Sequence, residues 1–427
     1  MQSEKNLKEL LDAGVIDQSI ANDIRDYYKA KSKGSSNKLL VIFGVFGALM
    51  IGLGIILIIN HNWDNLPRWV KTILAFVPMV IGQALCFYSL WKKDGERVWK
   101  ESSAIFLTLG IGACIALISQ TYNLEGNLQG FLEIWMVLSI AIIYIMDSTN
   151  VALLFLIALI SYLAYGYDQT GSYKTIIGFL LFVVAFSPFY IFKLRSKSKE
   201  NALNFIHWLF PISLLVGLGL FYVESNSIPI IGYVLLLSIL YMIGHSKYMR
   251  EFRLLKNGYL ILGALGMLGI LNAYTFSEMY RISEFPSGLI GEGHLQISLH
   301  ACLFVIALLG LIYHRNIKTT LVQAPKIPVF VLFIFLLMLS PVSIIMSTIL
   351  TNVLVLGLGV LTVKTGLHKD HLGIMNYGLL IITIFVICRF FSVDIPFVIR
   401  GILFIVMGIL FFVANRMLIN KRRENDE

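Results

Sequence analysis

The sequence has few charged residues for its length. Of 427 residues, only 14% are Asp, Glu, Lys or Arg, whereas 57% are hydrophobic. A soluble domain usually carries about 25% charged residues, so a soluble fold this apolar would lack the polar side chains that cover a surface. Lipid is the alternative solvent, and there only helices or closed barrels satisfy every backbone polar group. The apolar runs are continuous rather than alternating, which predicts helices.

Cysteine is scarce, and familiar catalytic motifs are missing. Four cysteines lie in apolar runs without a CxxC or Cys/His spacing, which favours packing over redox or metal chemistry: Cys86, Cys114, Cys302 and Cys388. His368 and His371 lie three residues apart, but no third and fourth ligand accompanies them. There is no Walker loop, GxSxG, HExxH or haem-attachment motif. We therefore predict no cofactor, no metal and no catalytic residue, although an enzyme with an unfamiliar site stays open.

A basic stripe interleaved with aromatic residues is also absent, although the formal net charge is +9. Membrane proteins hold Lys and Arg in their cytoplasmic loops, and this explains the charge better than nucleic-acid binding does. The first 38 residues are polar, and the first apolar run is too long for a cleavable signal peptide. We expect that run to be an uncleaved first span.

Residues 1–38 differ from the rest of the chain. Leucine and isoleucine recur at helical spacing on both sides of Gly14, which fits a helix stop, and Asp17, which fits the N-cap of a second helix. We predict a cytoplasmic helical hairpin with a basic linker. The hairpin either binds a partner or its own copy, or covers the cytoplasmic face of its own chain.

The remaining chain predicts an all-α, polytopic integral membrane helix bundle over 39–415, with a short charged cytoplasmic tail at 416–427. Apolar runs indicate about fourteen transmembrane helices, with twelve as the lower bound. The predicted spans are 39–59, 70–91, 103–119, 131–146, 150–166, 175–192, 203–223, 228–244, 258–275, 295–313, 327–345, 347–363, 373–391 and 396–415. Small residues at close spacing predict near helix contact in two spans, at Gly44, Ala48 and Gly52 and at Gly263, Gly266 and Gly269.

Lysine and arginine alternate between the two sides of this layout. With the N-terminus inside, nearly all of them fall in inside segments, and the outer segments and flanks hold only Arg68, Lys71, Lys174, Arg281, Arg389 and Arg400. The positive-inside rule therefore predicts an even number of spans with both termini in the cytoplasm.

Three polar groups on the predicted outer side are the candidate ligand or ion-pair cluster. They are Trp63, Asp64, Arg68 and Trp69; Gln120, Tyr122 and Glu133; and Arg389, Asp394 and Arg400. Charged groups at membrane depth are costly and usually face a cavity or one another. The first group fits an interfacial anchor with an ion pair, or an anion site at Arg68.

Glu133 and the two C-terminal arginines need partners. Glu133 lies about one turn inside an apolar helix, so it either pairs with an outer-side arginine or carries a proton. Arg389 and Arg400 oppose the positive-inside trend. They reach phosphate headgroups, neutralise an acid, or hold an anionic substrate. Histidine and asparagine residues within spans are expected to form interhelical hydrogen bonds: His207, His300, Asn272, Asn352 and Asn376.

The order and spacing of several segments resemble the bacterial predicted membrane proteins known as domain of unknown function 2157. The segments are Leu7 to Asp17, the glycine-rich first span, Asn62 to Trp69 and Gln120 to Leu124, within about 4–165. The chain departs where that family has a His near Asn123 and a Pro near Glu125. Its end, from Arg400-Gly401 to Asn415-Arg416, also looks like that of longer members. The resemblance implies a bacterial cytoplasmic membrane protein and supplies no activity.

Three functions remain open from the sequence. The first is a transporter or flippase-like protein for a lipid or anionic envelope component, with membrane lipids as its partners. The second is a non-catalytic scaffold or regulator acting through the N-terminal hairpin, which resembles short bacterial oligomerisation motifs and thus favours a homo-oligomer. The third is an intramembrane enzyme on a lipid-linked substrate, using Asp64 or Glu133.

Overall fold

The chain divides into two compact units, Met1–Leu74 and Ala75–Glu427, which are described separately. The computed structural model describes residues 11, 13–14, 17–24, 50, 65–169, 172–196, 201–222, 229–250, 252–282, 294–313, 323–324, 327–392, 398, 401–402, 405–406, 408–409, 412–413 and 416. The predicted domain boundaries at 38/39 and 415/416 fall outside these residues and stay predictions.

In the first unit, the described residues agree with the local signals for a hairpin. Gly14 has a φ of +66°, the left-handed conformation of a helix stop, and its N–H donates to Leu11 O at 3.1 Å. Asp17 Oδ1 accepts from Gln18 N at 2.7 Å, and residues 18–24 are helical. The rest of the predicted hairpin lies outside the described residues.

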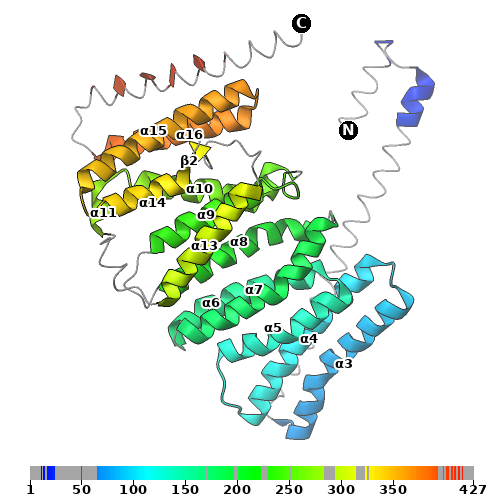
Figure 1. The fold of residues 1–427 in the computed structure, drawn as a ribbon. Coiled ribbons are helices and arrows are strands. Elements are labelled where there is room, and N and C mark those ends of the chain that lie inside the picture. Colours follow the sequence, from blue (N-terminus) through cyan, green and yellow to red (C-terminus); the bar gives the residue numbers. More distant parts are fainter. Residues whose placement is uncertain are drawn as a thin grey trace. The chain divides into compact units, whose positions relative to one another are not determined.

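Helices make up nearly all of the described structure (Figure 1). Their bounds are α3 (Arg68–Lys92), α4 (Arg97–Tyr122), α5 (Leu128–Met146), α6 (Thr149–Gln169), α7 (Ser172–Arg195), α8 (Asn201–Tyr222), α9 (Pro229–Gly244), the 3-10 helix η2 (Leu254–Lys256), α10 (Gly258–Ala273), α11 (Ser277–Ile282), α13 (His294–Tyr313), α14 (Val329–Leu339), α15 (Ile344–His368) and α16 (Leu372–Ser392). A two-residue antiparallel ladder pairs β1 (Gln323–Ala324) with β2 (Ile327–Pro328), a small exception to the predicted all-α fold.

The lengths of the apolar runs determine where these helices lie, and local capping residues and turns determine where they end. Asn123 and Asp147 take left-handed φ values of 49° and 51° as the C-caps of α4 and α5. α14 ends at Leu339, before the turn that contains Pro341, and Ser343 Oγ then caps α15 by accepting from Met346 N at 3.2 Å. The helix α14 is therefore shorter than the predicted span 327–345, and α15 begins earlier than the predicted span 347–363.

Within the described residues, eight helices are long and apolar enough to cross a membrane, namely α3 to α8, α15 and α16. Four shorter apolar helices occur in α9, α10, α13 and α14. Together they coincide with twelve of the predicted spans. The predicted span 39–59 lies outside the described residues except for Met50, and most of 396–415 lies outside them.

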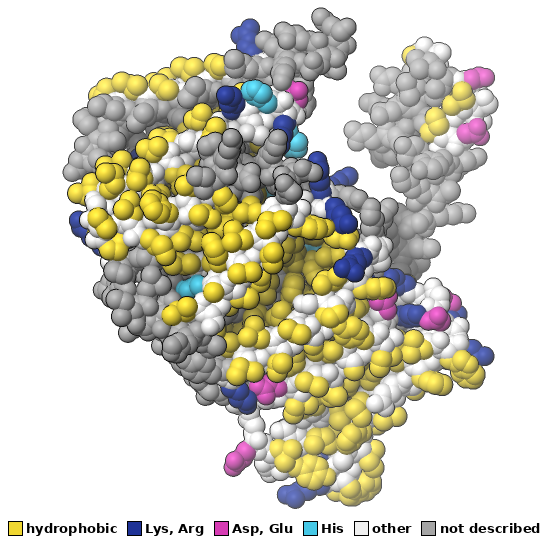
Figure 2. All heavy atoms as spheres, in the orientation of Figure 1, with side chains coloured by type: hydrophobic (Ala, Val, Ile, Leu, Met, Phe, Trp, Pro, Cys, Tyr) yellow, Lys and Arg dark blue, Asp and Glu magenta, His cyan; other side chains and the backbone are white. Residues whose placement is uncertain are grey.

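Two hydrophobic clusters hold the second unit together. The first joins α4 to α8 around large buried side chains such as Phe155, Tyr162 and Phe186. The second joins α9, α10, α13, α14, α15 and α16 around Met267, Phe330 and Phe333. Many other apolar side chains stay exposed, including Trp91, Ile145 and Phe192 (Figure 2). Because contiguous apolar surface of this kind needs an apolar solvent, the chain is a multi-pass membrane protein.

Side-chain contacts place several basic connections at one end of the Ala75–Glu427 unit, which we call the basic face. Lys193, near the end of α7, bonds Asp147 in the α5–α6 connection. Tyr190 on α7 bonds His207 near the start of α8, and Trp208 Nε1 donates to Leu255 O in the α9–α10 connection at 3.0 Å. Because successive helices reverse direction, the end of α10, the start of α15 and the end of α16 lie at the opposite face.

Candidate functional site

Apart from Arg389, which is described below, the structure describes five residues of the predicted outer cluster. Arg68 and Trp69 begin α3 in the Met1–Leu74 unit, and Trp69 is 67% exposed. Gln120 and Tyr122 are exposed at the end of α4. Glu133 lies on α5. The structure does not describe Trp63, Asp64, Asp394 or Arg400, so their part in this cluster stays a prediction.

Glu133 contacts a lysine and a tyrosine rather than an arginine. Tyr162 Oη on α6 donates to Glu133 Oε1 at 3.1 Å, and Lys174 Nζ on α7 lies 3.9 Å from Glu133 Oε2. Gln129, one turn earlier, donates to Thr175 Oγ1 at 2.8 Å. These contacts tie α5 to α6 and α7. No hydrogen bond or ion pair joins Glu133 to Arg389 within the described residues.

Arg389 forms a separate polar site at the opposite face. Its Nη2 donates to Asn352 Oδ1 at 2.7 Å and to the carbonyl oxygen of Thr275, just beyond the end of α10. Asn352 Nδ2 donates to the same carbonyl at 3.0 Å. The guanidinium also lies over the rings of Phe276 and Phe385. An arginine of α16 thus meets the C-terminal end of α10 and the start of α15.

The acceptors around Arg389 are neutral. Within the described residues no carboxylate lies within ion-pair distance of its guanidinium, and the buried Nε has no hydrogen-bond partner. The buried side-chain oxygens of Ser347 and Asn272, on the adjoining helices, also have none. Among the described residues, a cation without a carboxylate partner and polar atoms without hydrogen bonds therefore lie close to the end of a membrane-crossing helix.

The short helix α11 anchors the same region. Tyr280 Oη lies 2.6 Å from Thr351 Oγ1 of α15, and its ring packs edge-on against Tyr274. Burial raises the pKa of Tyr280 to about 12, so its hydroxyl stays protonated at neutral pH. The contact fixes the α10–α11 connection, which supplies the Thr275 carbonyl.

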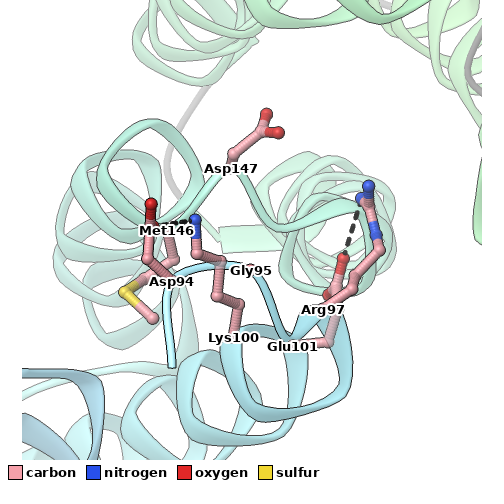
Figure 3. Close-up of a pocket in the computed structure, with 7 residues that line it drawn as sticks. All are labelled: Asp94, Gly95, Arg97, Lys100, Glu101, Met146 and Asp147. Atoms are coloured by element: carbon pink, nitrogen blue, oxygen red, sulfur yellow. Dashed lines mark hydrogen bonds and ion pairs between the residues drawn. The ribbon is translucent and has the colours of Figure 1, made fainter. Parts of the chain in front are cut away.

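A second polar site, at the basic face, was not predicted from the sequence. A pocket of about 190 Å³ is lined by Asp94, Gly95, Arg97, Lys100, Glu101, Met146 and Asp147. Figure 3 shows the Lys100–Asp94 and Arg97–Glu101 ion pairs on two sides of it, with the Asp147 side chain directed away from both. The tight α3–α4 turn and the α5–α6 connection bring these charges together.

Glu101 is the most heavily bonded carboxylate of this region. Its Oε2 accepts from Ser148 Oγ at 2.5 Å and from Asn150 N and Nδ2 at 3.1 and 3.0 Å. Its Oε1 accepts from Thr149 N at 3.0 Å and, at 3.4 Å, from Arg97 Nη2. These donors include the first N–H groups of α6, which have no partner inside the helix. A side chain of α4 thus caps α6.

Asp147 links the same connection to α7. Lys193 Nζ donates to Asp147 Oδ2 at 2.8 Å and to its backbone oxygen at 3.2 Å. The Lys193 side chain is only 3% exposed, whereas that of Asp147 is 52% exposed. A buried ammonium needs such a partner, so this pair fixes the α5–α6 connection against α7.

Two predicted interhelical histidine bonds are confirmed. His207 Nδ1 lies 2.7 Å from Tyr190 Oη, and His300 Nε2 lies 2.5 Å from Tyr222 Oη. Asn352 also bonds outside its own helix, but Asn272 Nδ2 bonds Leu268 O within α10, so that prediction was wrong. Among the described residues, no three His, Cys, Asp or Glu side chains form a group that would hold a metal ion.

Sequence patterns could have drawn attention to the basic-face site in part. Asp147-Ser148 between two apolar runs is a turn and N-cap pattern, and Glu101 lies just before the predicted span 103–119. The pattern does not predict that the two segments meet, because Glu101 lies on α4 and Ser148 in the α5–α6 connection, far apart in the sequence.

No curated protein and no solved structure matches this chain. A family match covers residues 8–152, which include every residue that lines the basic-face pocket, whereas Arg389 lies outside this range. The match confirms the resemblance seen in the sequence: residues 8–152 match the family described as Predicted membrane protein (DUF2157).

Proposed function

We propose that this multi-pass membrane protein is a transporter or flippase-like protein that handles a lipid or another anionic envelope component, and that Arg389 contacts the anion. The supporting observation is that the Arg389 guanidinium has only neutral acceptors within the described residues, with Nε unpaired. Arg68, Asp394 and Arg400 stay in the proposal as further outer-side groups, on their sequence positions.

Electrostatics explains why an anion fits this site. A cation near the hydrocarbon is costly unless a counter-charge, water or a lipid headgroup compensates it. Guanidinium offers several N–H donors in a planar fork that matches phosphate or carboxylate oxygens. Asn352 and the Thr275 carbonyl both accept from Nη2, and the buried Nε has no acceptor among the described residues. A phosphate bound to the guanidinium would supply the counter-charge.

The proposal also includes orientation. We propose a bacterial inner-membrane protein with the basic face in the cytoplasm, as the positive-inside rule predicts. Arg389 would then reach the headgroup layer of the outer leaflet. What supports this orientation is that Lys193, Trp208 and Leu255 bring the basic connections to one end of the unit.

Binding of an anionic lipid tests the proposal. We expect the full-length protein, purified from nanodiscs of phosphatidylglycerol and phosphatidylcholine, to retain phosphatidylglycerol preferentially in native mass spectrometry. Arg389→Gln should reduce that preference about tenfold or more, because a charge-assisted hydrogen bond contributes about 1.5–3 kcal/mol. Arg389→Lys keeps the charge but not the planar fork of N–H donors, so its preference for phosphatidylglycerol should lie between those of the wild type and Arg389→Gln.

Arg281→Gln is the matched control. Arg281 is exposed and pairs with Glu278 at 3.0 Å on α11, close to the same face. It should leave phosphatidylglycerol retention unchanged. Transbilayer movement of a fluorescent phosphatidylglycerol in proteoliposomes then distinguishes a flippase-like protein from a binding protein. Unchanged retention in folded Arg389→Gln protein would contradict the assignment of the anion to Arg389.

A further inference from the structure

The connection between α9 and α10, residues 245–257, carries a regular series of cations. Every third residue in part of it is basic: Lys247, Arg250, Arg253 and Lys256. Glu251 is the one acid in this stretch of the sequence. All four cations are exposed. Among the described residues, no hydrogen bond or ion pair engages the side chains of the last three, which we call the connection cations. Their charge is therefore available to a ligand.

Inward contacts hold this connection in one conformation. Asn257 Nδ2 donates to Gly244 O at 2.8 Å and so joins the two ends of the connection. Met249 is fully buried, and the ring of Phe252 packs edge-on against His207 with 4.8 Å between the ring centres. The side chains that stay exposed are therefore presented by a packed turn and not by a loose loop.

Two large apolar side chains of the same turn are exposed. Leu254 is 61% and Leu255 is 80% exposed in the 3-10 helix η2. Arg253 and Lys256 lie directly on either side of this pair in the sequence. Leucines flanked by cations are typical of an interfacial segment, in which the apolar side chains insert among acyl chains and the basic ones reach the headgroups.

Contacts with α8 place η2 beside a membrane-crossing helix. Trp208 Nε1 donates to Leu255 O at 3.0 Å, and a Cβ atom built on Gly258 would lie 2.9 Å from Trp208 Cα. Because α8 begins at Asn201, Trp208 lies about 10 Å along that helix, at roughly 1.5 Å per residue. The connection therefore runs alongside α8 and not beyond its end, next to a tryptophan of the kind that occupies the headgroup layer.

We infer that this connection binds the anionic phospholipid headgroups of the surrounding bilayer, in the leaflet at the basic face. Phosphate oxygens would accept from the connection cations, and Leu254 and Leu255 would insert among the adjoining acyl chains. Anionic lipid is favoured over zwitterionic lipid because uncompensated charge at this depth is costly. An acidic protein would neutralise the cations but would leave the two leucines, beside a membrane helix, without an apolar solvent.

This inference is independent of the proposed function, because it concerns other residues and the opposite face of the unit. The experiment follows hydrogen–deuterium exchange of the amides in 245–257, by mass spectrometry, in the full-length protein. The nanodiscs contain phosphatidylcholine alone or phosphatidylcholine with phosphatidylglycerol. We expect phosphatidylglycerol to slow the exchange about tenfold or more, because each cation near an anionic surface contributes about fivefold. Salt at about 1 M should remove the slowing, because it screens charges more than about 3 Å apart.

Two kinds of variant separate the charges from the leucines. Replacing the connection cations together, by Arg250→Gln, Arg253→Gln and Lys256→Gln, should abolish the effect of phosphatidylglycerol and leave exchange in phosphatidylcholine unchanged. Leu254→Ser with Leu255→Ser should speed exchange in both lipids, because the apolar insertion is lost. The replaced side chains are all exposed, and the bond from α8 goes to a backbone oxygen that serine retains, so the fold is preserved.

Arg195→Gln is the matched control, because Arg195 is an exposed cation at the end of α7, on the same basic face, and lies outside the connection. Exchange over 245–257 in this variant should equal that of the wild type. Arg389→Gln, which tests the other site, should also leave it unchanged, so that the two proposals fail separately.

Three results would overturn the inference: equal exchange in the two nanodiscs, slowing that persists after all three cations are replaced, or an equal loss in Arg195→Gln. Polyglutamate added to phosphatidylcholine nanodiscs represents an acidic protein partner, and we expect it to slow exchange far less than phosphatidylglycerol does. Slowing by polyglutamate that matches the lipid effect, and that Leu254→Ser with Leu255→Ser does not change, would assign the surface to a protein and contradict the lipid assignment.

Discussion

Replacing Glu101 by alanine is expected to lower the free energy of unfolding by about 3–5 kcal/mol, the usual cost of removing one partner from a buried charged network. The side chain is 13% exposed and accepts from Ser148, Thr149 and Asn150 at the start of α6. Without it, several donors lose their acceptor, and each buried unpaired group costs about 1–3 kcal/mol. The measurement is reversible unfolding in mixed micelles.

Two variants make this result specific. Glu101→Gln keeps an acceptor oxygen but loses the charge that favours a helix N-terminus, so its loss should be smaller. Glu96→Ala removes another acid at the start of α4, whose side chain is 53% exposed and, among the described residues, pairs with Lys93, so the unfolding free energy of this variant should be close to that of the wild type. Equal losses for Glu96→Ala and Glu101→Ala would refute the role of Glu101 as the cap of α6.

The second large effect is expected at Gly263 on α10. A Cβ atom there would lie 2.6 Å from Tyr241 N and 2.8 Å from Leu237 O, both backbone atoms of α9. Backbone atoms cannot rotate away, so the two helices must separate. We expect Gly263→Ala to destabilise the protein by about 1–3 kcal/mol, the usual cost of overpacking, although alanine favours the helix itself.

Glycine-to-alanine substitutions at two other positions of α10 are the controls for Gly263→Ala. Gly269 has no atom within 4 Å of a built Cβ, so Gly269→Ala should be neutral or stabilise by up to about 1 kcal/mol through helix propensity. At Gly266 the obstruction is the side chain of Leu237, which has other rotamers, so Gly266→Ala should lie between the two. Unfolding in mixed micelles ranks the three, and equal effects at Gly263 and Gly269 would rule out close helix packing as the cause.

The three glycines of α10 also show how much of the helix packing could be predicted from the sequence: Gly263, Gly266 and Gly269. Their spacing predicted close helix approach, and the structure brings α9 against the first two. The spacing could not show that Gly269 differs from the other two, because the room at Gly269 depends on how α9 and α10 pack in three dimensions. The limits of α14 and α15 were similarly approximate, since Pro341 marks a break without giving the residues on each side at which the helices end.

Glu133 and Arg389 show the same limit for charges. Each was predicted to need a partner, because a charge at membrane depth is costly. The sequence favoured an outer-side arginine for Glu133, but Lys174 and Tyr162 are its partners, supplied by helices that pack directly on α5. Arg389 instead meets Asn352 and the Thr275 carbonyl, and a backbone acceptor cannot be recognised from residue identity.

The sequence by itself determined that this is a helical multi-pass membrane protein, where most of its helices lie and which face of the Ala75–Glu427 unit is basic. Those properties follow from apolar length and from the alternation of charge along the chain, and both are one-dimensional. Only the tertiary structure decided that Glu101 caps α6, that Asp147 holds Lys193 and that Arg389 meets Asn352. Such pairings depend on which helix faces pack together, and many packings satisfy the same apolar pattern.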